Sequence, residues 1–223
     1  VKNFQTICHQ TVEDDGLIFL AETIAGSRIR SEAKYAGVRV TLRAMLGKAV
    51  IPVQIDIGFG DVVTPSAYEA ELPTMLDSPK PRLLTYTRET VVAEKCEAML
   101  DLGIANTRLK DFYDLWLLAS HFPFEGLLLC QAIQATFERR GTAISVLPPV
   151  ALTAAFYADA ARQKQWSAFC RKGGLVSKVD FTLGQCIGVL QAFLLPPLRA
   201  VRNSAPLSGS WLPSDLSWQS RTE

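Results

Sequence analysis

The 223-residue sequence lacks an excess of charge of either sign, because 23 lysines and arginines stand against 22 aspartates and glutamates. Composition alone therefore indicates no general attraction to nucleic acid or to a membrane surface. Any basic site must be local. The chain is nevertheless long enough to bury most of its apolar surface without disulfides or structural metals.

Cysteine and histidine are also scarce. The five cysteines include no Cys-x-x-Cys pair, and His9 and His121 are the only histidines. An odd number of isolated cysteines is typical of reduced cytosolic thiols rather than of disulfides or zinc ligands. We therefore expect a cytoplasmic protein with free thiols at all five positions, which are Cys8, Cys96, Cys130, Cys170 and Cys186.

Long hydrophobic runs are absent as well. The longest apolar stretches, such as residues 127–130 and 192–195, fall far short of the roughly 20 residues that span a bilayer. The N-terminus lacks the basic and then apolar pattern of a secretory signal. We expect no membrane partner, and because the chain opens on Val1 without a methionine, we interpret Val1 as a cut end or an unusual start.

Alternating apolar and polar residues predict β-structure in the first part of the chain. Residues 37–46 alternate as a half-buried strand does, Gly47-Lys48 offers a turn, and residues 50–60 repeat the alternation. A further strand is predicted over residues 17–24, although Ala21-Glu22 interrupts its pattern. The sequence thus predicts three antiparallel strands.

The pattern changes to helical spacing after a connecting segment. Residues 61–81 are rich in Pro, Ser, Thr and Asp, which predicts a loop that joins sheet and helices or lines a substrate. Residues 89–102, which end at Gly103, and residues 109–120 then repeat apolar side chains at helical intervals. These two helices are expected to form a hairpin.

Three further helices and a tail complete the prediction. The helices cover residues 127–140, 153–171 and 183–194, with breaks at Pro148-Pro149, Gly173-Gly174 and Pro196-Pro197. Residues 201–223 are rich in Ser and Pro, so we expect this segment to be poorly ordered or to lie on the surface. The fold class is α+β, with a sheet region in residues 1–81, a helical bundle in residues 82–200 and a tail in residues 201–223.

Asp56 is the first candidate for chemistry. It lies on the polar face of the strand over residues 50–60, beside small residues that leave room around the carboxylate. Such a carboxylate can hold a divalent metal ion or orient a nucleophile, since hard cations prefer oxygen ligands. A solvent-facing aspartate at a strand end is the alternative.

Lys95 lies on the helix face that is expected to be buried, near Val92 and Met99. A buried lysine needs a partner, and the functional interpretation is an ammonium directed at a triphosphate or a carboxylate. The structural alternative is a long side chain that extends from the apolar face to solvent.

Asp111 and Asp114 are three residues apart on the next predicted helix and leave it from nearly the same face. Two carboxylates so close together repel each other unless a cation compensates them. Lys95 is the first candidate for that cation, and Arg108 and Lys110 are alternatives nearer in sequence. The group is either part of a site or an ion pair that only fastens the two helices together.

Other basic residues carry less information. Gly26-Ser27 precedes Arg28 and Arg30, but no Asp-x-Asp follows it, so a turn is the better interpretation than a nucleotide-binding motif. Cations on or near the predicted hairpin could contact an RNA backbone, and a solvated strand face explains them equally well. They are Arg28, Arg30, Lys34, Arg39, Arg43 and Lys48.

Three segments together resemble successive blocks of the AbiEii/AbiGii toxin family. They read Ile-Pro-Val-Gln-Ile-Asp-Ile-Gly-Phe-Gly-Asp at residues 51–61, Arg-Glu-Thr-Val-Val-Ala-Glu-Lys at 88–95, and Lys-Asp-Phe-Tyr-Asp-Leu at 110–115. Their order and spacing match as well as their letters, and the resemblance covers nearly all of the chain up to about residue 198.

The resemblance implies a nucleotidyltransferase-like sheet followed by helices that close over a nucleotide. It also implies a toxin of bacterial toxin–antitoxin and phage-defence systems, with a nucleoside triphosphate (NTP), tRNA and an antitoxin as partners and Mg²⁺ as cofactor. By motif match, Asp56 is a metal ligand, Lys95 binds the nucleotide phosphates, and Asp111 or Asp114 is the acidic residue of the helical part. All four are expected to be catalytic and to converge on one cleft.

The sequence departs from the family at its first block, a Gly-Gly or Gly-Ser turn followed by an Asp-x-Asp strand, which nothing before Asp56 supplies. We therefore expect the chain, as numbered, to be incomplete for catalysis, either as a fragment or as a shortened member. The alternative function is a non-catalytic remnant that binds an antitoxin or RNA.

Overall fold

The structure, a computed structural model, describes residues 1–12, 14–29, 37–77, 79–173 and 181–220. The chain divides into two compact units, Val1–Asp61 and Val62–Glu223. This division reflects only how compactly the residues are packed. The domain boundaries predicted at residues 81 and 200 therefore stay predictions.

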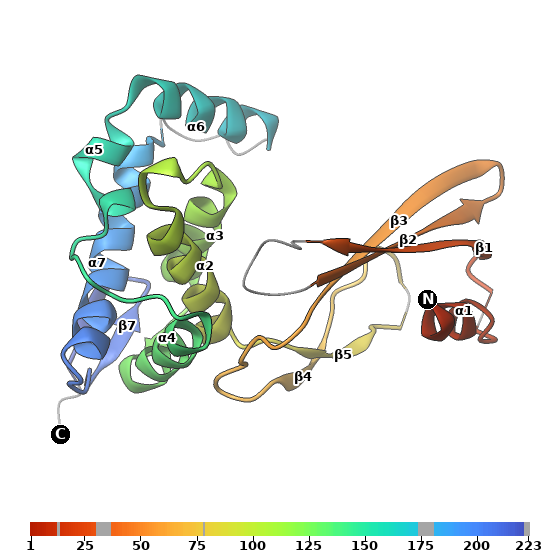
Figure 1. The fold of residues 1–223 in the computed structure, drawn as a ribbon, viewed down its shortest axis with the longest axis horizontal. Coiled ribbons are helices and arrows are strands. Elements are labelled where there is room, and N and C mark those ends of the chain that lie inside the picture. The colour runs from red at the N-terminus through yellow and green to blue at the C-terminus, as the bar shows by residue number, and fades with distance from the viewer. Residues whose placement is uncertain (13, 30–36, 78, 174–180, 221–223) are drawn as a thin grey trace. The chain divides into compact units, whose positions relative to one another are not determined.

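The first unit contains the three antiparallel strands that the alternation predicted. Strands β1 (Leu17–Ile29), β2 (Gly37–Leu46) and β3 (Ala49–Gly58) form one sheet in the order β1-β2-β3 (Figure 1). The apolar side chains of β2 supply the buried face, with Val40, Leu42 and Ala44 nearly inaccessible. A period of two residues thus separates an apolar face from a polar one, as predicted.

Strand β1 extends beyond its predicted range because it contains a bulge. Its register against β2 shifts between Leu20 and Ala25, and the backbone N–H of Arg43 donates to the Thr23 hydroxyl at 2.9 Å. That hydroxyl donates in turn to the carbonyl of Leu20 at 2.7 Å. The interruption at residues 21 and 22 in the sequence is this bulge, which resets the alternation. The short helix α1 (Lys2–Cys8), which contacts β1, was not predicted.

The second unit begins with a two-stranded sheet that the sequence did not predict. Strands β4 (Tyr68–Glu71) and β5 (Arg82–Thr85) pair antiparallel, so residues 61–81 are not entirely loop. Both strands have mainly exposed side chains, and the Pro- and Ser-rich residues around them hide the weak alternation. Helices α2 (Arg88–Leu102) and α3 (Leu109–His121) follow and contact each other, which confirms the predicted helical hairpin.

The remaining helices are α4 (Gly126–Arg140), α5 (Ala154–Tyr157), α6 (Ala160–Lys172) and α7 (Leu183–Arg202), with short 3₁₀ turns η1 (Gly103–Ala105) and η2 (Val150–Leu152). The single helix predicted over residues 153–171 is two helices. Helix α5 ends at Tyr157. The Asp159 side chain then accepts from the backbone N–H of Arg162 at 2.9 Å, and this N-terminal cap favours a new helix, α6, from Ala160.

Helix α7 continues through Pro196-Pro197, so the break predicted there is wrong. A proline at position 197 cannot donate to the carbonyl of Phe193 four residues earlier. The indole N–H of Trp218 donates to that carbonyl instead, at 3.0 Å. A residue from the last segment of the chain thus supplies the hydrogen bond that the helix lacks.

The prediction that residues 201–223 are poorly ordered or lie on the surface is wrong for residues 210–219. Strands β7 (Ser210–Leu212) and β8 (Ser217–Gln219) form a sheet with β6 (Phe124–Glu125) in the order β6-β7-β8. Trp211 is fully buried and donates to the carbonyl of Ala119 at 2.7 Å. In a continuing helix this carbonyl would accept from the backbone N–H four residues later, but that residue is Pro123, which has no N–H. The indole of Trp211 therefore supplies the missing donor.

The elements confirm the α+β fold class, with small antiparallel sheets and several helices. All five cysteines are free, as expected. Within the part of the chain that the structure describes, no helix combines the length and apolar character that crossing a bilayer requires.

Candidate functional site

Lys95 lies at the centre of an ion cluster in the second unit. Its ammonium Nζ is 2.5 Å from Asp111 Oδ1 and 2.8 Å from Asp114 Oδ2. Lys110 Nζ contacts the same Asp114 oxygen at 2.6 Å from the preceding turn of α3. The prediction that Lys95 compensates the two aspartates is confirmed, and Lys110 is a second partner.

The helical hairpin positions this cluster. Thr87 caps the N-terminus of α2, because its hydroxyl accepts from the backbone N–H of Thr90. Val92, Cys96 and Met99 form the buried apolar side of this helix. The neighbouring face carries Lys95 toward α3. Because residues three apart on a helix share a face, Asp111 and Asp114 both reach the same ammonium.

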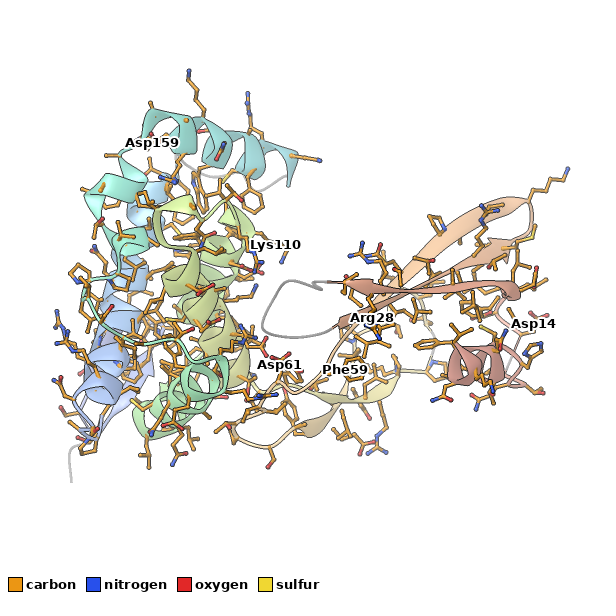
Figure 2. The ribbon with its side chains drawn as sticks, in the orientation of Figure 1. Asp14, Arg28, Phe59, Asp61, Lys110 and Asp159 are labelled. Carbon is orange, nitrogen blue, oxygen red and sulfur yellow. The ribbon has the colours of Figure 1, made fainter. Side chains whose placement is uncertain are left out.

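The cluster is half-buried and electrically balanced. The side chains of Lys95, Asp111 and Asp114 are 21%, 19% and 21% exposed, whereas Lys110 is 73% exposed. Two ammonium groups face two carboxylates, so the net charge of the four side chains is zero. Figure 2 shows Lys110 extending from α3 toward solvent.

The pKa values of the cluster follow from burial and pairing. Burial opposes the charge of Lys95, but its hydrogen bonds to Asp111 and Asp114 together outweigh that effect and raise its pKa above the ordinary 10.5. Burial likewise opposes ionisation of Asp114, but hydrogen bonds from Lys110 and Lys95 lower its pKa below the ordinary 3.8. At neutral pH, Lys95 is therefore a charged ammonium and Asp114 a carboxylate.

Asp56 lies in the first unit on the polar face of β3, directly opposite Arg39 on β2. The guanidinium holds the carboxylate with two hydrogen bonds, Nε to Oδ1 at 2.7 Å and Nη2 to Oδ2 at 2.8 Å. Both side chains remain about two-fifths exposed, at 40% for Arg39 and 43% for Asp56. The hydrogen bond and the charge of Asp56 raise the pKa of Arg39. The sequence alone allows two interpretations of Arg39, a contact to an RNA backbone or a solvated strand face. Its pairing with Asp56 follows from the register of β2 against β3.

Asp56 belongs to one unit, and Lys95, Asp111 and Asp114 belong to the other. The three residues of the helical hairpin do come together, and Lys95 does not extend into bulk solvent. The expectation that Asp56 shares a cleft with them stays a prediction. Arg30 and Lys34, which were considered as RNA contacts, lie outside the described residues.

A second polar cluster on α2 was not predicted. Glu97, which is buried, accepts from Arg140 Nη1 at 2.8 Å and from the Thr142 hydroxyl at 2.5 Å. Gly141 takes a left-handed conformation, with φ of 63°, and turns the chain at the end of α4 so that Thr142 reaches the same carboxylate. Arg140 therefore joins α4 to α2.

Taken within each unit, the described carboxylates do not fit a magnesium site. Within the described ranges, no group of three or more His, Cys, Asp or Glu side chains could hold a metal ion. Arg39 engages both oxygens of Asp56, and lysines engage Asp111 and Asp114. Two-metal phosphoryl transfer needs several carboxylate oxygens that face the ions. Within either unit as described, these residues therefore form no ligand set for Mg²⁺, and the expected cofactor stays a prediction.

A hollow of about 440 Å³ lies between the C-terminal ends of α4 and α7. Phe137, Thr142 and Arg202 are among the residues that line it, and none of the four predicted site residues does. Its lining mixes apolar, acidic and basic groups, so its chemistry identifies no ligand.

The family described as "Nucleotidyl transferase AbiEii toxin, Type IV TA system" matches residues 2–182. No curated protein and no solved structure matches the chain. The matched range includes Asp56, Lys95, Asp111 and Asp114.

Proposed function

The chain belongs to the AbiEii nucleotidyl transferase toxin family, and we propose that its site serves nucleotide transfer from an NTP to the end of a tRNA. In that reaction the 3′ hydroxyl oxygen of the RNA attacks the α-phosphorus, the α–β phosphoanhydride bond breaks, and pyrophosphate and a proton are released. The protein acts mainly by positioning the reactants and by neutralising charge.

The observation that carries this proposal is the half-buried, charged Lys95. A lysine ammonium has three N–H donors, and Asp111 and Asp114 accept two of them. The third donor can contact a phosphate oxygen without breaking either contact. A low-dielectric position strengthens such a charge-assisted hydrogen bond.

Asp111 and Asp114 act in this proposal by holding Lys95 in place. Because Asp114 also accepts from Lys110, the pair of carboxylates fixes the direction of one buried ammonium and one exposed ammonium. The balanced charge of the cluster also limits its attraction for a polyanion. We therefore expect weak NTP binding by this cluster alone.

We further propose that the described residues are incomplete for catalysis. Among the described residues, Asp111 and Asp114 form no group of three metal-ligating side chains, and Asp56 is paired with Arg39. Magnesium dependence, and a role of Asp56 as metal ligand, stay predictions from the family resemblance, and we assign no step of the reaction to the ion.

A transfer assay tests this proposal. Residues 1–223 are incubated with labelled NTPs, tRNA and Mg²⁺, and an AbiEii-family protein that contains the Gly-Ser turn and the Asp-x-Asp strand serves as positive control. We expect incorporation by the control and background incorporation by this chain. Robust incorporation by residues 1–223 that Lys95→Ala abolishes would show that the active site is divergent rather than incomplete.

The alternative function is a non-catalytic remnant that binds an antitoxin or RNA, and the neutral, lysine-occupied carboxylate cluster favours it. A stable complex with the neighbouring gene's product, together with no NTP binding, would support this function over transfer. NTP binding that depends on Lys95 would exclude it in its simplest form.

The family description places the chain among toxins of type IV toxin–antitoxin systems, which implies an antitoxin as its partner. A cytoplasmic location and a role in phage defence are proposals that fit this family.

A further inference from the structure

Helix α6 concentrates positive charge in a chain that has almost no net charge. Its sequence, Ala-Ala-Arg-Gln-Lys-Gln-Trp-Ser-Ala-Phe-Cys-Arg-Lys, contains four cations and no carboxylate. The whole chain has 23 cationic and 22 anionic side chains, so this helix departs from the average composition. Such a local concentration is what a near-neutral protein needs in order to bind a polyanion.

The four cations have two different surroundings. Arg162 is used inside the fold, because its guanidinium lies 4.1 Å from the centre of the Phe156 ring and donates to the carbonyl of Ile104. Lys164, Arg171 and Lys172 are exposed. Figure 2 shows nitrogen-tipped side chains projecting from α6.

The exposed cations lie opposite the buried side of the helix. Trp166 and Cys170 face the core, and at 100° per residue Lys164 and Arg171 lie near the centre of the opposite face. Seven residues of helix separate these two by about 10 Å along the axis, a span that about three phosphates of a nucleic-acid strand cover. Ser167 and Ala168, which are exposed between them on the same face, are small and allow a backbone to approach.

Helix α6 is fixed to the helix that carries the ion cluster. The Phe169 ring packs edge-on against Tyr113 of α3, with ring centres 5.8 Å apart. Tyr113 lies in sequence between Asp111 and Asp114. The basic face and the Lys95 cluster therefore belong to the same compact unit.

We propose that the outer face of α6 binds the phosphate backbone of the RNA on which this protein acts. The choice of RNA over other polyanions rests on the proposed function. The three exposed cations supply the charge complementarity, and the contact to α3 connects the bound strand to the helix whose Asp111 and Asp114 contact Lys95. Contacts of this type position a nucleic acid without reading its sequence.

Binding of fluorescently labelled tRNA tests this assignment, measured by anisotropy without NTP at salt concentrations from about 50 to 200 mM. The test variant combines Lys164→Gln, Arg171→Gln and Lys172→Gln. The control variant combines Lys80→Gln, Arg199→Gln and Arg202→Gln, which removes three exposed cations elsewhere in the same unit. Arg199 and Arg202 lie in the last turn of α7 as Arg171 and Lys172 do in α6, so both variants lose similar interactions with helix-end carbonyls.

We expect the α6 variant to weaken tRNA binding and to reduce the slope of log affinity against log salt by about 2 to 3, while the control keeps both. Equal losses in the two variants, or no loss in either, would overturn the proposal. Competition by polyglutamate as strong as that by RNA of equal charge would also overturn it, in favour of an acidic protein partner.

The readout is independent of catalysis. Absence of nucleotide transfer leaves the binding result interpretable. Conversely, failure of the unsubstituted chain to bind tRNA would overturn this inference while NTP binding at Lys95 could still be measured. Circular dichroism of both variants checks that their helices are intact.

Discussion

The two units of the chain each pair an acidic side chain with a cation, but in different surroundings. In the first unit, Arg39 and Asp56 form an ion pair across two strands on an exposed face. The described residues of this unit bury only three apolar side chains, all of them from β2. In the second, Lys95 joins Asp111 and Asp114 between two helices beside an extensive apolar core.

This difference separates two roles for the same kind of contact. An exposed ion pair gains little free energy, because water solvates both partners when they separate. A half-buried pair cannot be broken so easily, because each partner left alone lacks both water and a counter-charge. The Lys95 cluster is therefore expected to contribute to stability, whereas the Arg39–Asp56 pair is expected to exchange partners readily.

Truncation of the core should give the largest effect and sharpen the contrast between the units. Trp211→Ala removes a fully buried indole that packs against Phe193 and donates to the Ala119 carbonyl. We expect a loss of about 3–5 kcal/mol in the free energy of unfolding, measured by urea denaturation. The exposed aromatic Phe59 of the first unit is the control, and Phe59→Ala should change stability by less than about 0.5 kcal/mol. Similar losses in both variants would contradict the contrast.

The ion cluster should give the next largest effect. Lys95→Ala leaves two half-buried carboxylates without their shared cation and should cost about 1–3 kcal/mol. Adding Asp114→Asn should restore part of that loss, because one of the repelling charges is removed. Additive effects in the double variant would show that the residues do not interact. Lys110→Ala, at an exposed partner of Asp114, should cost less than about 1 kcal/mol.

A smaller effect is expected in how the contribution of Asp114 to stability depends on pH. The pKa of Asp114 is lower in the folded chain than its ordinary 3.8, so its contribution is present above that value and is lost as the pH falls through the folded pKa. Lys95, whose pKa is raised, remains charged throughout this acid range. The stability difference between the unsubstituted chain and Asp114→Asn should therefore shrink as the pH is lowered below 3.8. A difference that stays constant would contradict the lowered pKa.

The smallest effect is expected in the first unit. Arg39→Gln removes the bidentate contact to Asp56, but both side chains are already well exposed. We expect no measurable change in the urea midpoint of unfolding, and the same result in high salt. A loss as large as that of Lys95→Ala would show that the pair is a structural anchor and would break the comparison.

Periodicity predicted the elements that bury one face. The alternation in β2 and β3 and the helical spacing in α2 and α3 follow directly from side-chain direction, so these elements and the Lys95–Asp111–Asp114 cluster could be predicted. The cluster was predictable because local spacing places the two aspartates together and burial requires a counter-charge.

Features that depend on distant residues could not be predicted in this way. Pro196-Pro197 normally ends a helix, and only the indole of Trp218, far along the chain, makes continuation possible. The Arg140–Glu97 contact likewise joins residues on two helices with no local signal. The short strands β4, β7 and β8 are held by their partners rather than by their own alternation.

Triphosphate binding tests the central claim, that Lys95 is the phosphate-binding group of this chain, most directly. Titration of each NTP without RNA compares the unsubstituted chain with Lys95→Ala and with Lys110→Ala, which removes an equal charge from the same cluster. We predict that Lys95→Ala weakens binding by about tenfold or more, equivalent to at least about 1.4 kcal/mol, while Lys110→Ala has a smaller effect. Equal affinity in the unsubstituted chain and Lys95→Ala, with all variants folded, would contradict the claim and leave Lys95 as a purely structural cation between α2 and α3.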